Sequence, residues 1–323
     1  MRAIPAASRG EAQVSRADRR SPPGLLMRVA VIGDCTLDVT VRPSAPVRPG
    51  GDVPASVELG PGGQGANVAV RLARLGVSVS LAAPVADDVA GSILRSSLAA
   101  ENVQLRSLAA ARSAAVVALL DAGGERAMLS DRVTLDPDAA TRACAGADWV
   151  HCSAYPLADD ATGDALASSL GGLAASARVS VAGGSLPPDP ALVARVRARL
   201  TSSGASLLIF GQDEASALLG TRVESLAAGA AALQAAFPGT WAIVTGGAEG
   251  SAAAGRAEAL SVPGRSVETV DATGAGDAYT AGLIAALLHE EWPASARAMH
   301  RAMLAATELG AQAAGVLGAQ GLP

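Results

Sequence analysis

Short apolar segments that alternate with alanine-rich helical segments constrain this fold more than any other feature. The segment Arg28–Gly33 is an apolar run that ends in glycine, as buried strands often do. Later runs predict further strands at residues 149–153, 179–182, 207–210 and 241–245. This repeated alternation predicts an α/β domain, with a parallel sheet covered by helices on both faces.

Other segments predict a smaller sheet. Residues 36–41 and 53–59 alternate apolar and polar side chains, and a proline- and glycine-rich connection separates them. This pair predicts a small sheet that stands off the main body. Residues 115–120 and 126–129 predict a hairpin with its turn at 121–124. Helices are predicted over 65–75 and 89–100.

Composition excludes several classes of protein. All 25 basic residues are arginines. Without lysine the chain has no Walker A loop, no protein-kinase strand lysine and no Schiff-base nucleophile. A net charge of −5 and only three Trp, two Tyr and two Phe argue against nucleic acid as the main partner. The uncharged stretch 225–248 is broken by Phe237–Gly239 and predicts a helix, a turn and a strand, not a membrane span.

The first 27 residues differ from the rest because they are rich in arginine and contain no secretory signal. They predict a disordered tail or a start misplaced ahead of Met27, with a transit peptide as the less favoured alternative. The three cysteines and three histidines lack disulfide or metal-ligand spacing, which predicts reduced, buried thiols and no zinc site. With no targeting signal, the expected compartment is the cytoplasm.

A first glycine-rich loop, Gly60–Asn67, opens the helix predicted over 65–75. Glycines let a ligand approach the backbone, and a helix N-terminus offers unpaired amides. Asn67 could bind a polyol or cap the helix, and an ordinary glycine turn is the alternative.

A second loop, Val270–Asp277, precedes an apolar helix predicted over 278–288. Successive N–H groups at the positive end of a helix bind anions without lysine. Gly274, Ala275 and Gly276 would supply these amides, and the Asp277 carboxylate could accept a proton from an attacking hydroxyl. An acid beside such amides suits phosphoryl transfer, because the acid activates the nucleophile while the amides hold developing charge.

Two segments, GGQGANVAVRLARLG at 62–76 and DATGAGDAYTAG at 271–282, resemble the signatures of the ribokinase-like sugar kinases, the PfkB carbohydrate kinase family. The resemblance extends over residues 28–323. It implies a three-layer α/β/α fold with a mostly parallel central sheet and a small β-sheet lid, whose strands come from about 36–60 and 114–130. Shorter matches to the family lie at residues 33–38, 86–91, 124–126, 245–250 and 318–323.

The resemblance implies transfer of the γ-phosphoryl group of ATP to a hydroxyl of a small pentose or hexose, with Mg²⁺ on the phosphates. Asp277 would be the base, and the amides of residues 274–276 the anion hole. The residues implied to bind the sugar are Asp38, Gly62, Gly63 and Asn67. Those implied to lie by the nucleotide are Thr245, Gly247, Gly250 and Thr273. Glu214 would hold Mg²⁺ through water, and Asp271 with Thr273 would offer a site for K⁺.

The chain also departs from the family. Gly211 replaces the asparagine of the NxxE motif, residues 181–184 supply neither Asp nor Asn, and Gln64 stands where ribokinases often carry lysine. These departures keep two alternatives open: a nucleoside kinase of the same family, and a degenerate sensor that binds sugar or nucleotide with little turnover. A dinucleotide-dependent dehydrogenase is disfavoured because no GxGxxG follows the first strand. The resemblance also permits a homodimer formed through the lid.

Overall fold

The computed structural model describes residues 27–120, 126–184 and 189–321. Residues 1–26 of the tail predicted at 1–27, and the predicted hairpin turn at 121–124, lie outside these ranges. Within them, β1 (Arg28–Ile32) lies inside a nine-stranded sheet of order β13-β12-β11-β10-β9-β8-β1-β4-β5. The other strands are β4 (Ser78–Pro84), β5 (Gln104–Leu108), β8 (Trp149–Ser153), β9 (Arg178–Ala182), β10 (Leu207–Gly211), β11 (Trp241–Thr245), β12 (Ser251–Gly255) and β13 (Glu258–Val262).

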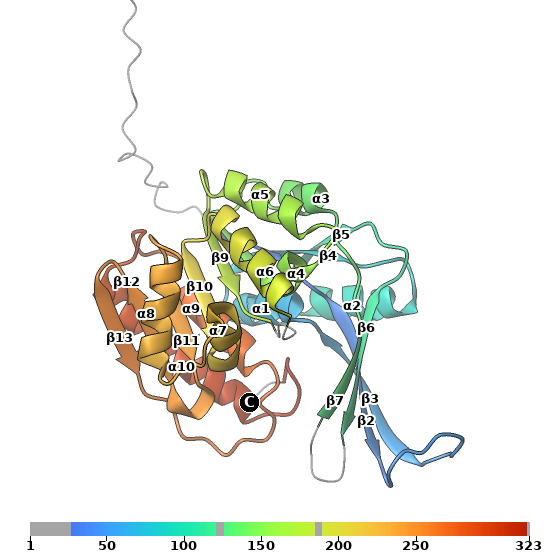
Figure 1. Cartoon of the computed structure of the whole chain (residues 1–323). Helices are drawn as coiled ribbons and strands as arrows, with labels where there is room; N and C mark the ends of the chain where they lie inside the picture. Colours follow the sequence, from blue (N-terminus) through green and yellow to red (C-terminus); the bar gives the residue numbers. More distant parts are fainter. Residues whose placement is uncertain (1–26, 121–125, 185–188, 322–323) are drawn as a thin grey trace, which may run out of the picture.

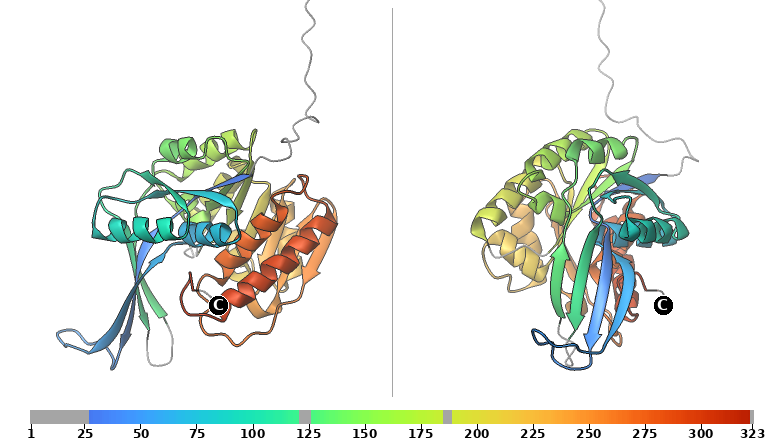
Figure 2. Two further views of the ribbon diagram at one scale, coloured as in Figure 1. Left: turned by 180° about the vertical axis from the view of Figure 1, so that it is seen from behind. Right: turned by 90° about the vertical axis from the view of Figure 1, so that its right-hand side faces the viewer.

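Helices cover both faces of this sheet (Figure 1), because the central strands are apolar on both sides. Val29 and Val31 of β1 pack in one core layer, and Ala30 and Ile32 pack in the other. The first layer, which faces the viewer in the left panel of Figure 2, contains α1 (Gln64–Arg74), α2 (Val89–Ala100), α9 (Ala275–Leu287) and α10 (Ala296–Ala314). The second contains α3 (Pro137–Ala143), α4 (Ala154–Ala158), α5 (Gly163–Leu173), α6 (Pro190–Ser202), α7 (Gln212–Leu219) and α8 (Leu226–Ala236).

A separate four-stranded sheet, here called the lid, projects from one end of the main body (Figure 1). Its order is β3-β2-β6-β7, with β2 and β6 parallel and the outer pairs antiparallel. The lid strands are β2 (Thr36–Pro43), β3 (Ala55–Gly62), β6 (Ala114–Leu120) and β7 (Arg126–Asp131). The α/β fold with a mostly parallel sheet and a smaller lid is therefore confirmed.

The sequence did not predict β5, β12 or β13. The β12–β13 pair is antiparallel and closes one edge of the main sheet beside β11. Residues 251–255 are SAAAG, a small-residue run that favours helix as readily as strand, and only pairing with β11 makes it a strand. No helix in the described ranges is both long and apolar enough to cross a membrane.

Candidate active site

Asp277 lies in the first turn of α9, whose N-cap is Gly274 in the left-handed conformation (φ 77°). Its carboxylate accepts a hydrogen bond of 2.8 Å from Asn67 Nδ2 on α1. The pKa of Asp277 is raised to about 7, mainly by burial and also by the nearby carboxylates of Asp34 and Glu214, against the hydrogen bonds from Asn67 and Gln64. A carboxylate with this pKa is suited to accept a proton near neutral pH.

The predicted anion hole lies at the same helix end. Ala278 N–H closes the first turn on Gly274 O at 2.9 Å, so the preceding amides have no partner within the helix. Among them, Ala275 N–H bonds outside the helix, to Ala272 O at 3.3 Å. Ala275 and Gly276 line a cavity of about 420 Å³. An anion in that cavity would therefore meet the positive end of α9 beside Asp277.

The predicted sugar residues come together at the base of the lid. Asp38 on β2 accepts a hydrogen bond of 2.6 Å from Thr36 Oγ1, and burial raises the pKa of Asp38. Gly62, at the end of β3, lies so close that a Cβ there would stand 2.0 Å from Asp38 Oδ2. Gly63 then turns the chain into α1 with φ 94°, which favours glycine. Asn67 follows on α1 and is buried.

Three further residues belong to this region. Asp34, at the end of β1, forms an ion pair of 3.0 Å with Arg132 and accepts the Gly65 N–H at 3.2 Å. The Arg132 guanidinium lies 3.6 Å from the centroid of the Tyr155 ring. Asp34, Arg132 and Tyr155 line a second cavity, of about 300 Å³. The position of Asp34 directly after the first strand was a signal in the sequence, but its pairing with Arg132 was not.

The larger cavity is bounded by the residues predicted to lie by the nucleotide. Thr245, Gly247 and Gly250 line it, together with residues of the loop 265–272 and of α10. Gly250 has φ 96°, and a Cβ there would stand 2.1 Å from Val262 O, so the loop closes on the end of β13. Thr273 does not line this cavity: its N–H and Oγ1 donate to Asp271 Oδ1 at 2.9 and 2.6 Å.

Asp271 anchors the C-terminal segment as well, since its Oδ2 accepts the Gly318 N–H at 3.0 Å. The predicted role of Asp271 and Thr273 at a monovalent cation stays a prediction.

Glu214 lies in the first turn of α7 and folds back to accept the Gly211 N–H at 2.8 Å. Burial raises its pKa. A Cβ at Gly183 would stand 1.9 Å from Glu214 Oε2, so the carboxylate rests on the backbone at the end of β9. Gln64 Nε2 donates to the carbonyl of the same Gly183.

No group of three or more His, Cys, Asp or Glu residues in the described ranges is arranged to hold a metal ion. Mg²⁺ usually keeps several waters and binds one or two carboxylates together with substrate phosphates. Glu214, whose charge also acts on Asp277, fits such a water-mediated arrangement.

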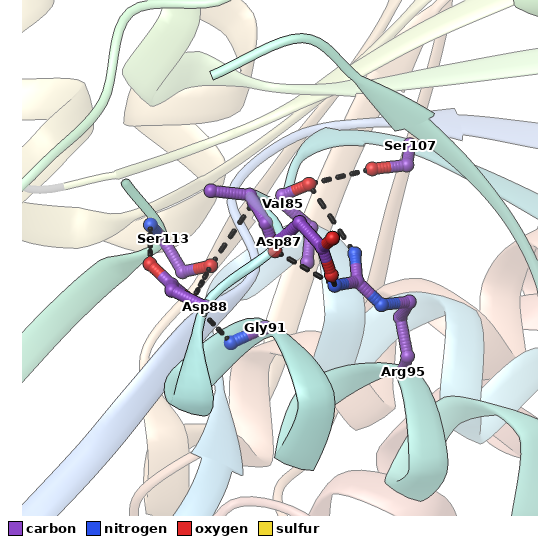
Figure 3. Close-up of polar contacts among 8 residues, drawn as sticks. Val85, Asp87, Asp88, Gly91, Arg95, Ser107 and Ser113 are labelled. Carbon is purple, nitrogen blue, oxygen red and sulfur yellow. Dashed lines mark hydrogen bonds and ion pairs between the residues drawn. The ribbon is translucent and has the colours of Figure 1, made fainter. Parts of the chain in front are cut away.

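The segment 86–91 has a structural role. Asp88 is the N-cap of α2 and accepts the Gly91 N–H at 2.7 Å. The same carboxylate accepts the N–H and the hydroxyl of Ser113, both at 2.8 Å (Figure 3). Since Ser113 directly precedes β6, this contact fastens the start of a lid strand to α2. The hydrogen bonds of the ionised form lower the pKa of Asp88.

Comparison with known proteins identifies the family. The pfkB family carbohydrate kinase pattern matches residues 27–323. The chain belongs to the PfkB carbohydrate kinase family. As a PfkB kinase it is an ATP-binding phosphotransferase that acts on an alcohol group of a sugar. Among similar solved structures, a Pyrococcus horikoshii sugar kinase is bound to ATP, and two structures of a Vibrio cholerae fructokinase contain ADP with a potassium or a calcium ion.

Individual relatives of this PfkB kinase are fructokinases and ribokinases. It is 31% identical to a fructokinase of Klebsiella pneumoniae over 280 residues, which are 80% of this chain and 87% of the relative. It superimposes with a TM-score of 0.74, at 25% identity, on a Vibrio cholerae fructokinase double mutant bound to fructose, ADP and potassium, covering 91% and 94% of the two chains. A ribokinase of Thermotoga maritima shares the fold, with a TM-score of 0.71, 19% identity and coverage of 91% and 95%.

Proposed function

We propose that this kinase phosphorylates a hydroxyl of a small neutral sugar, with Asp277 as the base. One observation carries the proposal: the Asp277 carboxylate, with its pKa raised to about 7, lies in the first turn of α9, directly after Gly276 of the cavity of about 420 Å³, and bonds to Asn67 beside the lid base. The sugar hydroxyl gives its proton to Asp277 as its oxygen bonds to the γ-phosphorus. The bond from that phosphorus to the ADP oxygen breaks, and ADP leaves with the electron pair.

The amides of Gly274, Ala275 and Gly276 would stabilise the negative charge that develops on the transferring group. Asp38, Gly62, Gly63 and Asn67 would hold the sugar hydroxyls, and Thr245, Gly247 and Gly250 the nucleotide. Mg²⁺, held through water by Glu214, would neutralise phosphate charge. We extend the potassium seen in the Vibrio cholerae fructokinase structure to a site near Asp271 and Thr273.

Charge at the lid base favours a neutral sugar over a phosphorylated one. Asp34 lies close enough to Asp38 and Asp277 for its charge to raise the pKa of both carboxyls. The neighbouring cation, Arg132, is already paired with Asp34. A substrate phosphate would meet net negative charge, whereas sugar hydroxyls can donate to these carboxylates. With fructokinases among the relatives, fructose is the first candidate.

We also propose that two copies of the chain pair through the lid. In the lid register, Asp38 pairs with Gly60 and Val116, so these residues share one face. The alternate residues form the opposite face, which is almost entirely apolar: Leu37, Val39, Val41, Val57, Leu59, Ala115, Val117, Leu119, Ala127 and Leu129. A second copy of the same face is a self-complementary cover for such a surface.

The decisive test measures ADP release from Mg-ATP with fructose, glucose, ribose, fructose 6-phosphate and adenosine, each with and without potassium. We expect turnover with a neutral sugar, its loss in Asp277→Asn, and retained ATP binding in that variant. Asp138→Asn, a change on the exposed surface of α3, is the matched control. Undiminished turnover in Asp277→Asn would refute the assignment of the base. If no acceptor gives ADP release although ATP still binds, the alternative of a degenerate sensor with little turnover would be favoured.

A further inference from the structure

The side chain of Gln320 is linked to the proposed base through one intervening amide. Gln320 Nε2 donates to Asn67 Oδ1 at 3.0 Å, and Asn67 Nδ2 donates to Asp277 Oδ2 at 2.8 Å. Gln320 belongs to the C-terminal segment and Asn67 to α1, so the chain of hydrogen bonds joins three distant parts of the sequence. Both bonds run in the same direction, from Gln320 through Asn67 to Asp277.

The direction matters because an asparagine side chain has one acceptor end and one donor end. Gln320 presents an N–H to Asn67, and this is satisfied only when the Asn67 oxygen faces Gln320. The Asn67 NH₂ group then faces Asp277. Since Asn67 is buried, an Asn67 oxygen without its donor would be costly, and the amide would rotate toward other donors.

The backbone around Gln320 is held firmly to α1. Arg71, which is buried, donates to Ala319 O at 3.1 Å, and Arg74 donates to Gln320 O at 2.8 Å. The segment also approaches the predicted anion hole, since a Cβ at Gly274 would stand 2.7 Å from Ala319 O. The C-terminal segment therefore contacts α1, the start of α9 and, through Gly318, Asp271. A segment anchored at these points can hold a side chain in one place.

We propose that Gln320 is a positioning residue, which fixes the Asn67 amide with its N–H groups toward Asp277 and so keeps the base ready to accept a proton. This inference rests on the proposed function, because it gives Asp277 the role of base. Gln320 itself does not touch the reacting atoms; it acts through Asn67.

A change in the orientation of the Asn67 amide would alter the pH dependence of turnover. The charged groups that act on Asp277 are Asp34 after β1, Glu214 on α7 and Arg71 on α1, and none of them is altered by a substitution at Gln320. The N–H donated by Asn67 favours the ionised form of Asp277 and lowers its pKa. Weakening that bond raises the pKa, so less of the base is ionised at pH 7 and activity returns as the pH rises.

The test compares the pH profile of kcat/KM for Gln320→Glu and Gln320→Leu with the wild type. Glu at this position offers only acceptors when ionised, so it competes with Asp277 for the Asn67 NH₂ group. We expect its acid limb to move up by about one pH unit, with kcat/KM at pH 7 about fivefold lower and recovered near pH 9. Gln320→Leu should move the limb in the same direction by less. Gln104→Leu, at an exposed position on β5, is the control.

The same substitutions in an Asn67→Ala background complete the test. If Gln320 acts through Asn67, the Gln320→Leu shift disappears there. An equal loss of activity at every pH, or a Gln320→Leu shift that persists without Asn67, would overturn the proposal and leave Gln320 a structural role. Turnover retained by Asp277→Asn would instead overturn the proposed function. ATP binding by each variant shows that it is folded. Where Gln320→Leu fails this check, the neutral variant Gln320→Met takes its place, because the charge added by Gln320→Glu raises the pKa of Asp277 with or without Asn67.

Discussion

At the scale of single residues, the burial that raises the pKa of Asp277 suits it to accept a proton but lowers the stability of the fold once the carboxyl is ionised. Its pKa is about 7 in the folded chain, against 3.8 for an ordinary aspartate. Between pH 3.8 and about pH 7 the Asp277 carboxyl is therefore mostly protonated in the native state and mostly ionised in the unfolded state. The stability linked to this proton is fully present below about pH 4 and is lost as the pH rises through 7. At alkaline pH the fold carries a poorly solvated carboxylate that catalysis needs and folding does not.

We expect Asp277→Asn to stabilise the protein, and to do so more at high pH. The gain in the free energy of unfolding should be about 1–3 kcal/mol at pH 8.5 and smaller at pH 5.5, because the wild-type carboxyl is mostly protonated at the lower pH. Urea unfolding at both pH values measures this, with Asp138→Asn as the control. A gain that is independent of pH would contradict the assignment of the raised pKa.

Gly62 offers a test of the sugar site because a methyl group there has no room. The added carbon would overlap Asp38, whereas a Cβ at Gly60, two residues earlier on β3, would meet nothing within 4 Å. We expect Gly62→Ala to displace the Asp38 carboxylate and raise the KM for sugar by about tenfold to a hundredfold, with the KM for ATP little changed. Gly60→Ala should behave like the wild type in the same steady-state assay. Equal sugar KM values for the two variants would show that Asp38 does not bind the sugar.

At the scale of elements, the buried strands were predictable because each is an apolar run whose hydrophobicity is visible locally. The β12–β13 pair was not, since its conformation depends on pairing with β11. The same division holds in the site. Asp277 and its glycine loop lie within one short motif, so sequence could assign them together. The contact between Asp34 and Arg132 joins residues 98 positions apart, and the contact between Gln320 and Asn67 joins residues 253 apart, so only folding reveals them.

The far end of α9 is held by Arg178, the first residue of β9. Its guanidinium donates to Leu287 O at 2.9 Å, Leu288 O at 3.1 Å and Glu290 O at 2.6 Å, and so satisfies carbonyl groups at the C-terminus of the helix. The same group lies 5.5 Å from the Trp149 ring centroid and 5.6 Å from that of Trp292. This arginine therefore fastens the helix that carries Asp277 to the main sheet.

We expect Arg178→Met to lower the free energy of unfolding by about 2–4 kcal/mol, because buried carbonyl groups lose a charged donor. Activity per folded molecule at 25 °C should change little, since the substitution is remote from the N-terminus of α9. Thermal unfolding and kcat measured on the same samples separate the two effects. Arg222→Met, at a position 87% exposed, is the control and should leave the melting temperature unchanged. A kcat that fell in step with stability would mean that this end of α9 influences the chemistry directly.

At the scale of the whole molecule, the lid has two faces with different chemistry. One face carries Asp38 and turns toward the site, and the other is apolar, although the lid projects from the main body (Figure 1). A freely projecting sheet with such a face exposes hydrophobic area to water. If the lid of a second copy covers this face, each lid packs against its partner. Dimerisation would then hold each lid in place and favour an ordered sugar site.

Two neighbouring residues of β7 lie on opposite faces of the lid and so allow the faces to be tested separately. Leu129 pairs with Val117 on the apolar face, and Met128 pairs with Ala118 on the face that carries Asp38. Their side chains are similarly exposed, at 59% and 56%. We expect the wild type to have twice the chain mass of 31.7 kDa in light scattering, Leu129→Arg to have the monomer mass, and Met128→Arg to remain dimeric. A charge in the centre of an apolar interface is not solvated, whereas one on the other face stays in water. A wild type that is monomeric at micromolar concentration, or variants that dissociate equally, would exclude pairing through this face.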